Sequence, residues 1–176
     1  MSIFKKLERI RRKRGSVAIA LIDPDFKYHK KIKAMTSLIN KSDFDAIFVG
    51  GSRISDDDFS VRLRIIKNNT NLPVIIFPGS SKQISKYADA LLYLSLISGR
   101  NPNYLIEEYV KSAPVIHKFA LETIPTAYIL LDGGIKSSVE IISNTRPIPM
   151  ENHKTVLAHA LAGQYLGKSF IFLETA

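Results

Sequence analysis

The sequence contains no cysteine among its 176 residues. Disulfide bonds, thiolate nucleophiles and cysteine-based zinc sites are therefore excluded, and a reducing, cytoplasmic environment is expected. No run reaches 18 apolar residues, so a membrane-spanning helix is not expected. The amino terminus lacks the apolar segment and cleavage site of a secretory signal. The Walker loop, G-x-G-x-x-G, H-E-x-x-H and nucleophile-elbow motifs are absent as well.

Acidic residues are few relative to basic ones: 16 Asp and Glu against 25 Lys and Arg, a formal net charge of +9. Much of the excess lies in residues 1–15, MSIFKKLERIRRKRG, where Ile3, Phe4, Leu7 and Ile10 recur at helical spacing. We expect a basic helix here that either packs one side on the domain or rests on an anionic membrane surface. A nucleic-acid-binding arm is least favoured, because no aromatic platform or binding motif accompanies the charges.

Apolar, β-rich runs alternate with helical patterns over residues 16–176, the expected domain. The runs are continuous, which indicates strands buried on both faces of a parallel sheet. The expected strands are 16–22, 45–51, 72–79, 88–96, 126–134 and 168–174. The expected helices are 29–40, 55–69, a short one over 82–87, 102–120 and 151–167.

This alternation predicts an α/β fold, either a doubly wound open sheet or a (β/α)8 barrel. The first and sixth strands begin near residues 16 and 169, which gives roughly 31 residues per unit. Eight such units need roughly 245 residues, close to the typical barrel of about 250. On this count the chain covers only about strands 1–6 of a barrel, and we expect it to be an incomplete version of a longer enzyme.

Acids and small residues gather at the expected carboxyl ends of the strands, where α/β proteins place their chemistry. The first strand ends in DPD (23–25), the second in GGS (50–52), the third in PGS, the fifth in DGG and the sixth in LETA. Gly/Ser turns suit phosphate, and carboxylates suit Mg²⁺. Asp23 is therefore a candidate ligand at the mouth of a site, whereas Asp25 is as well explained as a turn or helix-cap residue.

Several ordered blocks of sequence resemble the geranylgeranylglyceryl phosphate synthase family, which includes the bacterial heptaprenylglyceryl phosphate synthases. The blocks are LIDPD, DAIFVGGS, ADALLYLSLISGRNPNYLI, TAYILLDGG, SNTRPIP and AHALAGQYLGKSFIFLE. The resemblance implies a (β/α)8 TIM barrel. It also implies a Mg²⁺-dependent prenyltransferase of ether-lipid biosynthesis, in which the hydroxyl of sn-glycerol 1-phosphate attacks a prenyl diphosphate. The subgroup resemblance favours the geranylgeranyl donor over longer ones.

The family's functional positions carry over onto a few residues. Asp23 and Ser52 match the metal-binding positions, and Glu174 matches the acid that takes or orients the glycerol hydroxyl proton. The segment that holds glycerol 1-phosphate matches Phe172, Leu173, Glu174, Thr175 and Ala176. Phe172 departs from the family, which usually has Tyr there. The family's Gly-rich phosphate turns after strands seven and eight have no counterpart before Ala176.

A long apolar groove for the prenyl chain is implied as well, with Tyr93, Leu94 and Ile97 as candidate walls; a core role for these residues is equally expected. The connection 132–150 is long for a βα loop and suggests a lid that orders on substrate binding. A homodimer and peripheral membrane contact are further expectations. The alternatives are a sugar-phosphate barrel enzyme, which needs no apolar groove, and a non-catalytic, membrane-associated barrel fragment.

Overall fold

A computed structural model describes residues 2–52 and 57–175 of the chain. The chain folds as two compact units. The first comprises Met1–Leu92 and Pro114–Thr123, and the second comprises Tyr93–Ala113 and Ile124–Ala176. No helix of the described residues is long and apolar enough to cross a bilayer.

Parallel strands form the centre of the first unit. They are β1 (Ile19–Ile22), β2 (Ala46–Val49), β3 (Val74–Ile76) and the start of β4 (Ala90–Leu96). Ile19 pairs with Ala46, Ile47 with Val74, and Ile75 with Ala90. Every residue of β3 is buried, which confirms the inference from its continuous apolar run. In β1 burial alternates and Leu21 is 56% exposed, because successive side chains point to opposite faces and the face that Leu21 occupies is not covered.

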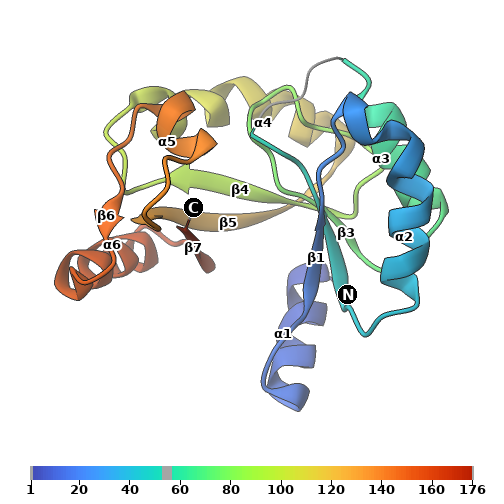
Figure 1. Cartoon of the computed structure of the whole chain (residues 1–176), viewed down its shortest axis with the longest axis horizontal. Helices are drawn as coiled ribbons and strands as arrows, with labels where there is room; N and C mark the ends of the chain where they lie inside the picture. The colour runs from blue at the N-terminus through green and yellow to red at the C-terminus, as the bar shows by residue number, and fades with distance from the viewer. Residues whose placement is uncertain (1, 53–56, 176) are drawn as a thin grey trace. The chain divides into compact units, whose positions relative to one another are not determined.

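Two amphipathic helices lie side by side in this unit, α2 (Ile32–Asn40) and α3 (Phe59–Asn68) (Figure 1). Both were predicted: the first prediction began three residues earlier, and residues 55 and 56 of the second lie outside the described residues. Each buries one stripe, as the 3.6-residue period requires, and leaves the opposite face in water. The buried apolar residues are Ile32, Ile39, Phe59, Leu63 and Ile66. A short 3-10 helix, η1 (Phe26–Lys31), leads into α2.

The helix predicted over 82–87 is wrong: these residues form turns and irregular backbone. Six residues are too few to nucleate a stable helix without strong tertiary support. Two side chains in the segment also bond to backbone groups, Ser85 by accepting the Tyr87 N–H and Gln83 by contacting two glycines. Such bonds compete with the helical pattern.

The second unit contains the rest of β4, all but the first two residues of β5 (Glu122–Asp132), β6 (Ile148–Pro149) and β7 (Phe170–Thr175). The Ile97 N–H donates to the carbonyl of Tyr128 at 3.0 Å, next to β4. β7 pairs in parallel with β5 from Thr126↔Phe170 to Leu131↔Thr175, and the short β6 pairs with the end of β5. All six predicted strands are thus present, and β6 is an addition.

The helices of the second half are η2 (Asn103–Glu107), a π-helical turn, followed by α4 (Glu108–Phe119), α5 (Ser138–Ser143) and α6 (His153–Tyr165). α6 packs Val156 and Ala160 on a core cluster of Ile129, Leu131 and Ile148. α5 and β6 both lie in the connection 132–150, which therefore carries regular structure. Ser137 caps α5 by accepting the Glu140 N–H at 3.0 Å. The lid role of this connection stays a prediction.

The strand order distinguishes the two architectures. The strands follow one another in the sheet as they do in the sequence, β1-β2-β3-β4-β5, and β7 continues beside β5. A doubly wound sheet reverses direction at a switch point, whereas a barrel does not. The chain therefore has the topology of consecutive (β/α) barrel units, through the sixth barrel strand.

The basic amino-terminal segment is a helix, α1 (Ile3–Arg14), as predicted. Glu122 holds its start: the two carboxylate oxygens accept the N–H groups of Ile3 and Phe4 at 2.7 and 2.9 Å. A carboxylate at this position satisfies otherwise unpaired amides and the positive end of the helix dipole. Leu7 is 3% exposed, so α1 packs one side on the first unit and turns its charges outward.

Candidate active site

The turns after β1, β2 and β3 meet at Gly50 and Gly51, where a side chain would have no room. A Cβ on Gly50 would lie 1.7 Å from the carbonyl oxygen of Phe77, and a Cβ on Gly51 would lie 2.9 Å from Oδ1 of Asp23. The Asp23 carboxylate therefore rests against the backbone of Gly51, the residue before Ser52. The structure brings the two predicted metal-ligand positions to neighbouring turns at one edge of the first unit.

Two hydrogen bonds to aspartate side chains fix the DPD turn, residues 23–25. Oδ1 of Asp23 accepts the Asp25 N–H at 3.0 Å, and Asp25 in turn caps η1 by accepting the Lys27 N–H at 3.2 Å. Pro24 is buried and fixes the turn. Asp25 thus has the capping role that the sequence offered as its alternative, while Asp23 is half-buried beside the Gly51 turn.

Gln83 joins the turns after β2 and β3 and was not singled out from the sequence. Its Oε1 accepts the N–H groups of Gly51 and Gly79 at 3.4 and 3.1 Å, and its Nε2 donates to the Gly51 carbonyl at 2.8 Å. A lone glutamine in a polar stretch carries no sequence signal for such a contact.

The predicted glycerol-phosphate segment lies on β7 of the second unit, where side chains alternate between faces. Phe172 and Glu174 are half-buried, whereas Leu173 and Thr175 are exposed. Ala176 lies outside the described residues. The ring of Phe172 stacks on Tyr128 of β5 at a centroid distance of 5.3 Å and an interplanar angle of 16°. The Tyr128 hydroxyl hydrogen-bonds the Glu174 carboxylate. Tyr128 was not predicted, because its position depends on the register of β5 and β7.

Burial sets the proton affinity of this pair. Partial desolvation raises the pKa of Glu174 above its ordinary value, and the hydrogen bond from Tyr128 acts in the opposite direction by stabilising the carboxylate. Burial also raises the pKa of Tyr128, and the charge of Glu174 raises it further. Tyr128 therefore stays protonated as a donor, and Glu174 is a stronger base than an exposed carboxylate.

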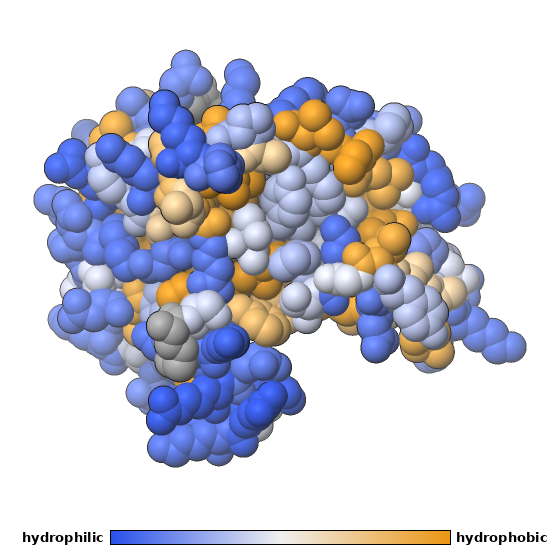
Figure 2. Space-filling model, turned by 180° about the vertical axis from the view of Figure 1, so that it is seen from behind, coloured by the Kyte–Doolittle hydropathy of each residue, from blue (hydrophilic) through white to orange (hydrophobic). Residues whose placement is uncertain are grey.

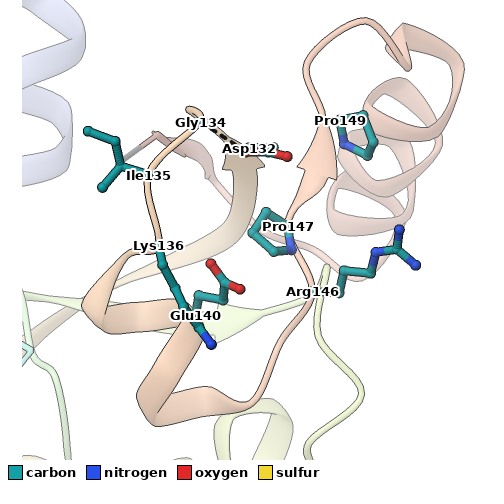
Figure 3. A pocket seen from close by; sticks show the side chains of 8 residues that line it. All are labelled: Asp132, Gly134, Ile135, Lys136, Glu140, Arg146, Pro147 and Pro149. Carbon is teal, nitrogen blue, oxygen red and sulfur yellow. Dashed lines mark hydrogen bonds between the residues drawn. The ribbon is translucent and has the colours of Figure 1, made fainter.

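A pocket opens at the carboxyl ends of β5 and β6 (Figure 3), with a volume of about 310 Å³. Its lining combines two acids and two bases with small and apolar residues: Asp132, Gly134, Ile135, Lys136, Glu140, Arg146, Pro147 and Pro149. Asp132 shapes the rim, since its Oδ1 accepts the Gly134 N–H at 2.9 Å. Leu131, next to Asp132, is paired with Thr175, so the pocket adjoins the end of the β7 segment.

The candidate prenyl-groove residues have packing partners within the second unit. Tyr93 stacks on Tyr109 of α4 at 4.0 Å and 21°, and each hydroxyl donates to the other residue's carbonyl at 3.0 Å. Ile97 packs against the cluster beneath α6, and Leu94 is half-buried. These contacts favour the core role for Tyr93 and Ile97, and the groove role stays a prediction.

Comparison with known proteins places this arrangement in a family. The model of the PcrB family matches residues 8–176. The chain belongs to the PcrB family. Geranylgeranylglyceryl phosphate synthase of Chitinophaga pinensis is 43% identical over 154 residues, which cover 88% of this chain and 61% of the relative. The protein of the same name from Flavobacterium johnsoniae is 44% identical over 164 residues, 93% of this chain and 68% of the relative.

A solved structure of (S)-3-O-geranylgeranylglyceryl phosphate synthase from Thermoplasma acidophilum, in complex with substrate sn-glycerol-1-phosphate, is also similar. It has a TM-score of 0.91 and 33% identity, over 100% of this chain and 71% of that chain. The family resemblance read from the sequence is thereby confirmed. The chain spans 61% of the length of the Chitinophaga relative, so it corresponds to part of those proteins.

The first unit of this PcrB-family chain offers a donor set that suits Mg²⁺. Asp23 supplies a carboxylate, and Ser52 a hydroxyl, on turns that touch. Mg²⁺ is commonly held by one or two carboxylates together with water and substrate phosphates. No group of three His, Asp or Glu residues forms a ready-made metal cluster in residues 2–52 and 57–175. The residues fit a cation site that a phosphate-bearing substrate would complete.

Removing the hydroxyl of Tyr128 tests the pairing with Glu174. Tyr128→Phe is expected to raise the pKa of Glu174 further, because the carboxylate loses the hydrogen bond that stabilises its charged form. A side-chain carboxyl titration by NMR measures the midpoint, with Glu174→Gln to assign the signal. Tyr165→Phe, at a tyrosine that is 81% exposed, serves as the control. An unchanged or lower midpoint in Tyr128→Phe contradicts the pairing.

Proposed function

We propose that the protein is a prenyltransferase that joins sn-glycerol 1-phosphate to geranylgeranyl diphosphate and so makes an ether-lipid precursor. The observation that carries the proposal is the contact between the Asp23 carboxylate and the turn bearing Ser52. Two further findings support it: the names of the relatives in the PcrB family, and the glycerol phosphate bound in the Thermoplasma structure. The substrates, the metal and the products are proposals for this chain.

The reaction needs one bond formed and one broken. The primary hydroxyl oxygen of glycerol 1-phosphate bonds to C1 of the prenyl chain, the C1–O bond to the diphosphate breaks, and the diphosphate leaves with the electron pair. We assign the hydroxyl proton to Glu174, whose raised pKa makes it a better acceptor than an ordinary carboxylate. Mg²⁺, held by Asp23 and Ser52, would supply positive charge to the departing diphosphate.

Tyr128 and Phe172 have supporting roles in this proposal. The hydrogen bond from Tyr128 fixes the orientation of the Glu174 carboxylate, and the stacked Phe172 ring holds Tyr128 in place. Phe172 cannot provide the hydroxyl that the family usually has at this position. We expect the loss to weaken the affinity for glycerol phosphate, with Glu174 still able to accept the proton.

The basic helix α1 supports a contact with an anionic membrane, which suits an enzyme with a lipid product. Lys5, Arg9 and Lys13 are spaced on one helix face and are all exposed. Figure 2 shows that the lobe formed by α1 is hydrophilic over its visible face. Two acids compensate part of the charge, Glu8 at 3.6 Å from Arg12 and Asp45 at 2.7 Å from Arg14. A homodimer and a cytoplasmic location stay predictions from the sequence.

Product formation tests the enzymatic proposal. Protein is incubated with Mg²⁺, radiolabelled glycerol 1-phosphate and prenyl diphosphates of graded length, and the organic-extractable product is counted. We expect product with geranylgeranyl diphosphate, and a loss of about 100- to 10,000-fold in Glu174→Gln because the proton acceptor is gone. Asp23→Asn should raise the Mg²⁺ requirement, and the exposed Asp43→Asn serves as a matched control.

The outcomes separate the alternatives. No product with any donor rejects the prenyltransferase. Turnover of a sugar phosphate in its place supports another phosphate-binding barrel enzyme, and vesicle binding without any turnover supports a non-catalytic fragment. The intact mass of the sample accompanies the assay, since 19.7 kDa corresponds to the 176-residue chain and a larger value to a longer protein.

Vesicle sedimentation tests the membrane contact separately. Each basic residue near an anionic surface contributes about 1 kcal/mol to the free energy of membrane binding. The triple variant Lys5→Glu/Arg9→Glu/Lys13→Glu should therefore bind phosphatidylglycerol vesicles about 100-fold or more weakly than the wild type. Added salt should weaken wild-type binding in the same direction. Lys30→Glu/Lys31→Glu/Lys33→Glu makes the same change in net charge at other exposed lysines. Equal loss in both triple variants would show a response to net charge alone and would contradict a role for α1.

A further inference from the structure

Gln83 is a buried side chain whose polar atoms all serve the turn that precedes Ser52. It is 3% exposed. Its Oε1 accepts the N–H groups of Gly51 and Gly79, and its Nε2 donates to the carbonyl of Gly51 at 2.8 Å. The backbone N–H and the backbone carbonyl of Gly51 are therefore both hydrogen-bonded to the Gln83 side chain.

The glycines around Gln83 pack backbone against backbone. A Cβ on Gly79 would lie 2.3 Å from the Gly51 carbonyl oxygen and 3.1 Å from the Cα of Ser52. On its other side, Gly51 meets the Asp23 carboxylate. The Gly51 turn is thus held between Asp23 and the Gly79–Gln83 pair, and its position decides how far Ser52 lies from Asp23.

We propose that Gln83 is a positioning residue that sets the separation of Asp23 and Ser52 and thereby the affinity of the site for Mg²⁺–diphosphate. The inference rests on the proposed function and names a residue that determines the site's affinity for Mg²⁺–diphosphate. Gln83 touches neither substrate nor metal; it acts through the Gly51 backbone. Replacing a residue that orients metal ligands without binding the metal itself typically changes metal affinity by about 10- to 100-fold.

Glutamine suits this place because its amide carries a donor and an acceptor on one planar group. Glutamate keeps the shape and the acceptors, but its ionised form has no N–H for the Gly51 carbonyl and would face that oxygen with a second oxygen. Methionine keeps the approximate length and removes all three bonds. The two replacements therefore separate loss of the donor from loss of the whole contact.

The experiment is calorimetric titration of the wild type, Gln83→Met and Gln83→Glu with inorganic diphosphate in the presence of Mg²⁺, together with steady-state kinetics. We expect diphosphate affinity to fall by about 10- to 100-fold in Gln83→Met, and to fall in Gln83→Glu as well, because a carboxylate oxygen would repel the Gly51 carbonyl. The KM values for Mg²⁺ and the prenyl diphosphate should rise in parallel, and KM for glycerol 1-phosphate should change less than about twofold. Gln164→Met, at an exposed glutamine in α6, should behave as wild type.

Each result bears on one claim. Unchanged diphosphate affinity in a folded Gln83 variant overturns the positioning role, and so does a uniform loss of kcat with every KM unchanged. Wild-type protein that binds no Mg²⁺–diphosphate overturns the proposed function and this inference with it. If Gln83→Met does not fold, Gln83→Glu decides the question, because its shape and acceptors are retained.

Discussion

The absence of side chains at Gly50 and Gly51 is the constraint on which the candidate site depends. Gly50 faces the Phe77 carbonyl at a distance where any Cβ would overlap it, and Gly51 faces the Asp23 carboxylate. Three successive turns can therefore come together at the carboxyl ends of β1, β2 and β3. A larger residue at either glycine would push the Ser52 turn away from Asp23 and leave two separate polar groups in place of a paired donor set.

In the second unit, the environment of Glu174 raises the pKa of its carboxylate while still providing one hydrogen-bond donor to it. Glu174 loses part of its hydration on β7, and the hydroxyl of Tyr128 replaces some of what is lost. Desolvation alone would favour the neutral acid, which cannot accept a proton. The Tyr128 bond offsets this, and the Phe172 ring stacked on Tyr128 keeps the donor oriented. The pKa of Glu174 and the packing of Tyr128 on Phe172 are thus coupled.

Much of the fold follows from local patterns, whereas the contacts that refine the site do not. Continuous apolar runs predicted the positions of all six barrel strands, although burial on both faces holds for β3 and not for β1 or β7, where burial alternates. Asp23 could be placed at the end of a parallel strand from the sequence pattern, whereas its pairing with Ser52 was implied by the resemblance to the family. Gln83 and Tyr128 could not be predicted, since their partners are set by long-range packing and strand register. The failed helix over 82–87 has the same cause: Gln83 bonds to Gly51, 32 residues away.

The most direct test of this account replaces Mg²⁺ by Mn²⁺ and records amide NMR spectra in the presence of inorganic diphosphate. A paramagnetic ion held between Asp23 and Ser52 should broaden the amide signals of Asp23, Asp25 and residues 50–52 most strongly. Asp23→Asn should abolish that broadening while the remaining spectrum is kept. Broadening that is absent from both turns, or that persists unchanged in Asp23→Asn, would contradict the claim that these two residues form one cation site.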